Sequence, residues 1–230
     1  MAIPHNRALR SLNWKEEITV NITIFGATGK VGSRVIAEAV SRGHSVTAVA
    51  RKTDRPDALP DAADFQPGDI GNIDDVISLS EGRDVVINAT RPADPQDAVQ
   101  TNREFMNGLA ETQVRALVVG GAASLLVPGM DGKTVLDDPR YLSPAFRHVG
   151  EASLAQYRAY IDESRVNWTY FSPPASLFAG SRTGDYRLGT DELLLDEEGK
   201  SRLSMEDLAV VLLDEAERPR HQLMRFTAAY

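Results

Sequence analysis

The 230-residue chain contains no cysteine, which excludes disulfides, thiolate catalysis, Cys-ligated zinc and iron–sulfur clusters. It has no run of about 18 consecutive apolar residues, so we expect no membrane span. Its net charge is −8, whereas nucleic-acid binding needs clustered Lys and Arg, so we expect no nucleic-acid partner. Residues 1–17 contain no apolar segment of signal-peptide length, and we predict a cytoplasmic protein with an N-terminal extension over 1–17.

Apolar strand-like segments alternate with segments of helical periodicity along most of the chain. Strands are predicted within 18–25, 45–51, 63–70, 84–90, 115–124, 166–173 and 224–230. Helices are predicted within 30–43, 73–82, 95–112, 150–164 and 204–219. This alternation predicts successive βαβ units and an α/β fold with a parallel sheet covered on both faces.

The pattern loosens after residue 125. The segment 125–146 is rich in loop-forming residues, and 184–201 has the composition of a hairpin-like excursion. Ser204 is the expected N-cap of the last helix, with Asp207 three residues later. We predict a single domain over 18–230, whose C-terminal part, about 125–230, contributes a small substrate lobe.

Three glycines, Gly26, Gly29 and Gly32, directly follow the first predicted strand and open the first predicted helix. In a dinucleotide site, Gly26 would allow a sharp turn out of the strand, Gly29 close approach of a pyrophosphate, and Gly32 tight helix–strand packing. The free N–H groups at the helix start face the phosphates. Three further residues lie where they can add contacts: Thr28, Lys30 and Val31. Because strand and helix both flank the glycines, we favour dinucleotide binding over a plain βα turn.

The second predicted strand ends in Arg51 and Lys52, where NAD sites commonly place an acidic residue for the ribose 2′-OH. Two cations here can pair with a 2′-phosphate, so we predict NADP(H) rather than NAD(H) as cofactor. A solvated strand end is the alternative. Asp69 follows the third strand, and 88–90 end the fourth at the edge where ligands of open α/β folds bind. Ordinary turn chemistry is the alternative for both.

The segments GATGKVGSRV, AVAR, GDI, NAT and VVGGAASL resemble the atypical short-chain dehydrogenase/reductases. Within them, the chain resembles the NAD(P)H-binding group that includes NmrA-like proteins, biliverdin reductase B-type flavin reductases and bacterial proteins of NADH-flavin reductase type. The run 172–230 is similar to the last subgroup in particular. The resemblance covers about 18–230 and implies a Rossmann-type, doubly wound parallel sheet.

The resemblance also implies where NADP(H) would lie along the strand ends. It implies a pyrophosphate on 26–31, a 2′-phosphate near Arg51, and an adenine near Asp69 and Ile70. The implied ribose and nicotinamide contacts are Ala89, Thr90, Gly120, Gly121, Ala122, Pro173 and Ala175.

Ketone-reducing members of the superfamily use a Tyr-x-x-x-Lys dyad, and no tyrosine of this chain has lysine four residues later. Hydride transfer to a flavin needs less from the protein, because the cofactor carries the chemistry. We therefore predict an NADPH-preferring reductase of a flavin, quinone or similar planar acceptor. The alternative is a non-catalytic NADP(H)-binding redox sensor of NmrA-like type, and a sugar-nucleotide epimerase or dehydratase fits less well.

Two residues are candidate catalytic groups. Ser124 lies just past the fifth predicted strand, where the superfamily often places a catalytic serine; a loop or cap role is the alternative. His148, in a predicted loop beside Arg147, has a side chain suited to proton donation; a surface position is the alternative. No His, Asp or Glu cluster has metal-ligand spacing, so we expect no metal. The expected partner is a small-molecule acceptor, bound by a monomer or homodimer.

Overall fold

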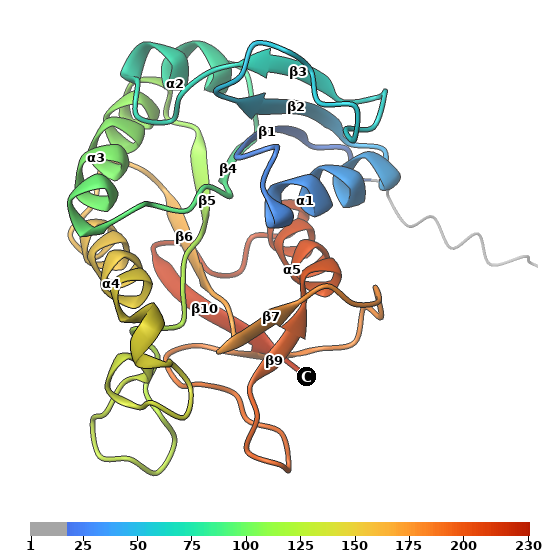
Figure 1. Cartoon of the computed structure of the whole chain (residues 1–230). Helices are drawn as coiled ribbons and strands as arrows, with labels where there is room; N and C mark the ends of the chain where they lie inside the picture. Colours follow the sequence, from blue (N-terminus) through green and yellow to red (C-terminus); the bar gives the residue numbers. More distant parts are fainter. Residues whose placement is uncertain (1–17) are drawn as a thin grey trace, which may run out of the picture.

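The computed structural model describes residues 18–230, so the predicted extension over 1–17 lies outside the described residues. Its centre is an eight-stranded sheet (Figure 1). The strands of this sheet are β1 (Asn21–Phe25), β2 (Ser45–Ala50), β3 (Asp64–Pro67), β4 (Val85–Asn88), β5 (Arg115–Val119), β6 (Trp168–Ser172), β8 (Arg187–Gly189) and β10 (Met224–Ala229). Their order is β3-β2-β1-β4-β5-β6-β10-β8, and every neighbouring pair is parallel except β10 and β8.

Five helices cover the two faces of this sheet. They are α1 (Lys30–Ser41), α2 (Ile73–Ser80), α3 (Pro95–Thr112), α4 (Arg147–Ile161) and α5 (Met205–Glu217). Successive strand residues point to opposite faces, so Ile24 packs with α1 and α5, whereas Phe25 packs with α2, α3 and α4. The inner strands β4, β5 and β6 are buried throughout, so they show no apolar/polar alternation, and the few polar residues they contain are buried as well. The predicted doubly wound α/β fold is confirmed.

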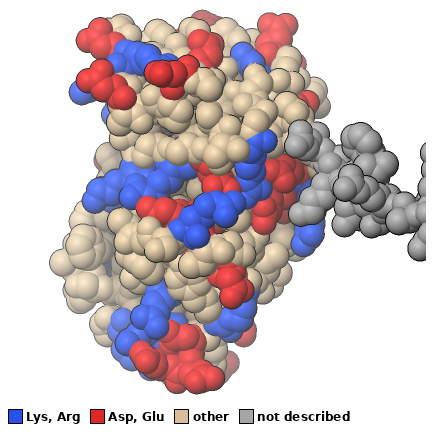
Figure 2. Space-filling model, turned by 90° about the vertical axis from the view of Figure 1, so that its right-hand side faces the viewer, with Lys and Arg blue, Asp and Glu red and all other residues tan. Residues whose placement is uncertain are grey.

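Charged side chains link α1 to α5 on the outer surface. Arg34 of α1 pairs with Glu206 of α5 at 2.6 Å, and Arg42 pairs with Asp214 at 2.7 Å. Figure 2 shows this side of the molecule, where a band of Lys and Arg is interspersed with Asp and Glu. The two helices are thus joined by ion pairs above an apolar contact.

A buried ion pair joins the amino end of β5 to the end of α5. Glu215 is only 4% exposed, and its carboxylate accepts from Nη2 of Arg115 at 2.7 Å. The other carboxylate oxygen lies 2.8 Å from Nδ1 of His221, whose ring stacks on Phe226 of β10. This cluster holds the connection between α5 and β10 against the sheet.

The expected hairpin-like excursion over 184–201 is wrong. β8 pairs antiparallel with β10 as the last strand of the main sheet, and the chain then runs beside Leu126. Leu126 donates to the carbonyl of Asp191 and accepts from the N–H of Leu193, both at 2.8 Å. The segment therefore packs mainly against β10 and the loop around Leu126, and it closes on itself at a turn where the N–H of Asp196 donates to the carbonyl of Lys200 at 2.8 Å.

Sequence periodicity also misses a second, two-stranded sheet. β7 (Ser176–Phe178) and β9 (Arg202–Ser204) pair in parallel, and each is three residues long, which is too short to show a period. A separate apolar cluster of Leu125, Val127, Val135 and Leu193 packs beneath the loops that follow β5. Two 3₁₀ turns, η1 (Val135–Asp137) and η2 (Pro144–Phe146), lead from these loops to α4. Within 18–230, no helix has both the length and the apolar character needed to cross a membrane.

Candidate cofactor and acceptor site

Two of the three glycines, Gly26 and Gly32, occupy positions where a side chain would collide with the backbone. Gly26 has a φ of +90°, and a Cβ there would lie 2.8 Å from the carbonyl carbon and oxygen of Ala89. A Cβ at Gly32 would lie 2.1 Å from the carbonyl oxygen of Gly26. At Gly29 the only near atom is that same carbonyl oxygen, at 3.2 Å, and the residue is exposed. The loop therefore packs tightly against β4 and α1 and is open at Gly29.

The N-terminus of α1 is open to an anion. Its N-cap, Gly29, supplies no side-chain hydrogen bond, and its first turn carries no acidic residue. Within 18–230, the N–H groups of Lys30, Val31 and Gly32 donate to no protein acceptor. Thr28 and Lys30 are exposed beside them. Free N–H groups and the positive end of the helix dipole fit the pyrophosphate of a dinucleotide.

Two exposed cations follow β2. Arg51 and Lys52 form no ion pair with any residue of the described part of the chain. No acidic residue stands at the end of β2 itself, which is Ala50. Both cations are free to meet a phosphate at this edge.

The two residues implied near the adenine follow β3. Oδ1 of Asp69 accepts from the N–H of Gly71 at 2.9 Å, and the N–H of Asp69 donates to Asp75 at 2.8 Å. Ile70 is buried in the core on the α2 side of the sheet. The carboxylate of Asp69 thus shapes the turn into α2, which leaves the adenine contact a prediction.

A buried amide fixes the end of β4. Asn88 is 1% exposed, and its Oδ1 accepts from the N–H of Thr90 at 3.0 Å and from the hydroxyl of Thr90 at 2.7 Å. The N–H of Ala89 donates to Phe25 at 3.0 Å. Ala89 and Thr90 are thereby held directly against the glycine loop.

The ends of β5 and β6 meet at the same edge. A Cβ at Gly120 would lie 2.0 Å from the ring of Tyr170, and one at Gly121 would lie 2.7 Å from Ser153 of α4. The backbone of 120–121 therefore sits directly on these two side chains. The remaining implied contacts are Ala122, Pro173 and Ala175. Ala122 and Ala175 are half-buried and pack on the apolar cluster around Leu125 and Leu193, and Pro173 is buried.

The two candidate catalytic residues lie in different settings. His148 is not in a loop, because α4 begins at Arg147 after the 3₁₀ turn η2; it is exposed in the first turn of that helix. Ser124 is half-buried, and its Oγ accepts from Nη1 of Arg225 at 2.8 Å. Both roles remain predictions.

Sequence reasoning missed Arg225, which lies in β10 and is 7% exposed. Its guanidinium also donates to Asp191 and lies 4.5 Å above the ring of Tyr157. An arginine inside the apolar terminal segment MRFTAAY was the available signal, since buried charges require partners.

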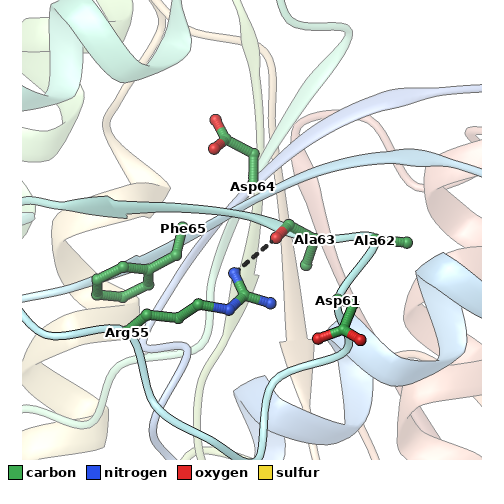
Figure 3. A pocket seen from close by; sticks show the side chains of 6 residues that line it. All are labelled: Arg55, Asp61, Ala62, Ala63, Asp64 and Phe65. Atoms are coloured by element: carbon green, nitrogen blue, oxygen red, sulfur yellow. Dashed lines mark hydrogen bonds between the residues drawn. The ribbon is translucent and has the colours of Figure 1, made fainter.

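One hollow of the described chain lies away from this edge of the sheet. A hollow of about 550 Å³ lies at the amino end of β3, away from the carboxyl ends of the strands (Figure 3). The guanidinium of Arg55 points along it and donates to the carbonyl of Ala63 at 2.8 Å, so this cation serves to close its own loop. No group of three or more His, Asp or Glu side chains within 18–230 is placed to hold a metal ion.

Comparison with known proteins agrees with this geometry. The NAD(P)H-binding family matches residues 26–219, and the chain belongs to that family. The uncharacterized protein YwnB of Bacillus subtilis is 33% identical over 220 residues, covering 90% of this chain and 97% of YwnB.

Two solved structures are similar over nearly their whole length. A Bacteroides thetaiotaomicron protein provisionally named an epimerase is 33% identical with a TM-score of 0.83, covering 92% of this chain and 98% of its own. SP1627 of Streptococcus pneumoniae, provisionally named an NADH-flavin reductase, is 30% identical with a TM-score of 0.79, covering 91% and 99%. The expected membership of an NAD(P)H-binding family is thus confirmed. It supports a nicotinamide dinucleotide cofactor and the general class of oxidoreductase.

Proposed function

We propose that this protein is an oxidoreductase that uses NADPH in preference to NADH to reduce a flavin, a quinone or a similar planar acceptor. The observation that carries the proposal is one edge of the sheet, where an uncapped helix N-terminus stands beside two cations that form no ion pair within 18–230. When bound there, the reduced nicotinamide supplies a hydride.

The residues of the chain have separate tasks in this proposal. The N–H groups of Lys30 and Val31 bind the pyrophosphate, and Arg51 with Lys52 binds the 2′-phosphate. Asn88 keeps Thr90 in place through two hydrogen bonds. A 2′-phosphate carries the charge that two cations favour, whereas the 2′-OH of NADH does not.

We infer a planar acceptor because the sequence lacks the Tyr-x-x-x-Lys dyad. No tyrosine has lysine four residues later, so the usual proton donor of ketone reduction is absent from the sequence. Reduction of a flavin or quinone relies on ring stacking and exclusion of water, because the acceptor can take protons from solvent. The provisional name of SP1627 is consistent with this acceptor class.

The test follows NADPH oxidation by absorbance with FMN as acceptor and NADH run in parallel. We expect saturable turnover, and in Arg51→Asp a rise of about tenfold or more in the KM for NADPH, because a phosphate contact is replaced by repulsion. The KM for NADH should stay within about twofold. Arg103→Asp, an exposed position on α3 with the same charge change, is the matched control. Equal effects on NADPH and NADH would contradict the NADPH assignment.

A non-catalytic NADP(H)-binding redox sensor is the second candidate, favoured by the absence of the Tyr-x-x-x-Lys dyad. It predicts tight NADPH binding by calorimetry, a different affinity for NADP⁺, and no oxidation with FMN, FAD, riboflavin or quinones. Turnover with any of these acceptors would exclude it.

A further inference from the structure

Arg225 joins three segments that are far apart in the chain. From β10 its Nη1 donates to both the carbonyl oxygen of Ser124, at 3.2 Å, and the Oγ of Ser124, at 2.8 Å. Its Nε donates to Oδ1 of Asp191 at 3.1 Å. The guanidinium lies over the ring of Tyr157 on α4, and that ring packs 5.0 Å from the ring of Tyr170. The guanidinium is therefore held on three sides.

The hydroxyl of Ser124 is restricted by this arrangement. A serine hydroxyl offers one hydrogen to donate and two lone pairs to accept. Arg225 occupies a lone pair, and within 18–230 the hydroxyl of Ser124 donates to no protein group. Ser124 is half-buried, so part of the residue faces solvent. The hydrogen of that hydroxyl is the part left for a ligand.

The loop that carries Ser124 is fixed next to the candidate nicotinamide contacts. It follows Gly120, Gly121 and Ala122 at the end of β5, and a turn closes where the N–H of Leu125 donates to Ala122 at 2.8 Å. Beyond the turn, Leu126 is hydrogen-bonded to the 191–193 segment. Ser124 therefore stands on a rigid support at the edge where the strands end.

We propose that Arg225 is the positioning residue of the acceptor site, which orients Ser124 so that its hydroxyl donates a hydrogen bond to the acceptor. This inference rests on the proposed reductase function. Arginine stays protonated at any pH the protein meets, so its bond to Oγ is charge-assisted and polarises the Ser124 O–H bond. A planar acceptor that gains a hydride develops negative charge on a ring nitrogen or carbonyl oxygen, and a donor aimed there stabilises it. Ser124 keeps its proton: the acceptor gains a hydride from NADPH, and the one proton that completes its two-electron reduction comes from solvent.

The test compares Ser124→Ala, Arg225→Met and the double variant, measuring kcat and KM with FMN, the Kd of NADPH and the Tm. We expect each single variant to lower kcat about tenfold, the size of one lost charge-assisted hydrogen bond in a transition state, with the Kd of NADPH within about twofold. The double variant should lose no more than either single one, because the two residues act as one unit. Ser124→Thr should restore most of the activity, since it keeps the hydroxyl.

Arg187→Met, an exposed arginine of the neighbouring strand β8, is the matched control and should keep wild-type kcat. If Arg225→Met does not fold, Asp191→Asn serves instead, because the side chain of Asp191 is 61% exposed and supports the guanidinium from outside. It should lower kcat in the wild-type background and have no further effect in Ser124→Ala.

Additive losses, or an unchanged kcat in Ser124→Ala, would overturn the role of Arg225 while leaving the reductase function in place. Both proposals would be overturned if the wild-type protein binds NADPH but does not oxidise it with FMN, FAD, riboflavin or any quinone.

Discussion

The helices α1 and α5 begin at the same edge of the sheet and pack against each other, yet their N-termini are built in opposite ways. At α5, the N-cap Ser204 accepts from the N–H of Asp207 at 2.9 Å, and Asp207 itself is fully buried. The carboxylate of Asp207 accepts from the N–H groups of Thr183 and Gly184, both at 2.7 Å, and from the hydroxyl of Tyr230 at 2.6 Å. At α1, the N-cap is an exposed glycine and the first turn carries no acidic residue.

The difference separates a helix start whose N–H groups are satisfied by the protein from one whose N–H groups are left for another acceptor. Every helix leaves N–H groups free at its N-terminus, and these must find acceptors. At α5 the chain supplies a hydroxyl and the first-turn acids Glu206 and Asp207, which fix the 180–185 segment as well as the helix. At α1 the protein supplies no such acceptor within 18–230, and we propose that the pyrophosphate of the cofactor takes this place.

The strongest way to break the contrast is to give α1 an acidic cap. Gly29→Asp fits the extended backbone there, with φ −76° and ψ 159°, and aspartate is a preferred N-cap. We expect NADPH affinity to fall by about a hundredfold or more, because the new carboxylate occupies the N–H groups and repels the phosphates. The Tm should stay unchanged or rise. Calorimetry and thermal unfolding measure the two effects.

The control for this change is Gly29→Ala, which adds the same Cβ without the charge. It should weaken NADPH binding by less than about fivefold, because the N–H groups remain free. Equal affinities of the two variants would mean that the N-terminus of α1 does not bind the phosphates.

The next prediction removes the acid at α5. Asp207→Asn should lower the free energy of unfolding by about 2 kcal/mol, because a buried acceptor of several hydrogen bonds becomes a poorer one. Burial alone would raise the pKa of Asp207, but the hydrogen bonds from Thr183, Tyr230 and Gly184 outweigh it, and the pKa lies below its usual value. Denaturant unfolding at neutral pH measures the loss.

The lowered pKa also sets a pH dependence. The stability that Asp207 contributes is present above the unfolded-state pKa of about 3.9 and is lost as the pH falls through the lower folded-state value. The wild-type Tm should therefore drop more steeply below pH 4 than that of Asp207→Asn. Asp185→Asn, an exposed acid two residues beyond Thr183, should follow the wild type. Parallel curves for wild type and Asp207→Asn would refute the assignment.

The smallest expected effect is that of the N-cap hydroxyl. Ser204→Ala should cost about 1 kcal/mol of unfolding free energy and leave NADPH affinity unchanged, because it removes one cap far in sequence from the glycine loop. Ser143→Ala, which precedes the turn η2 without a side-chain cap bond, should cost less than about 0.5 kcal/mol. Equal losses of unfolding free energy in the two variants would show that the cap hydrogen bond of Ser204 does not stabilise the protein.

Long periodic segments were predictable from the sequence, and short ones were not. The helix α3 runs over the predicted 95–112 because Asp94 and Pro95 mark its start and eighteen residues reveal its period. The first strand begins at Asn21 and not at residue 18, although the preceding residues are apolar or β-branched. β7 and β9 depend on tertiary pairing, which no local pattern encodes.

The same limit applies to the candidate site. The glycine loop and Arg51 directly follow the first and second predicted strands, so local sequence was enough to predict both as cofactor contacts. Ser124 was noticed, but its bond to Arg225 spans 101 residues and was invisible in the sequence. The placement of His148 in a loop was wrong because α4 starts three residues earlier than the predicted helix.

The buried pair of Arg115 and Glu215 has a consequence for the order of folding. The two residues lie 100 positions apart, so the ion pair requires closure of a very long loop. Strands β1 to β5 can assemble from shorter crossovers, whereas Arg115 gains its counter-ion only when α5 docks. We therefore expect the contacts of α5 to form late, so that breaking the Arg115–Glu215 pair speeds unfolding more than it slows folding.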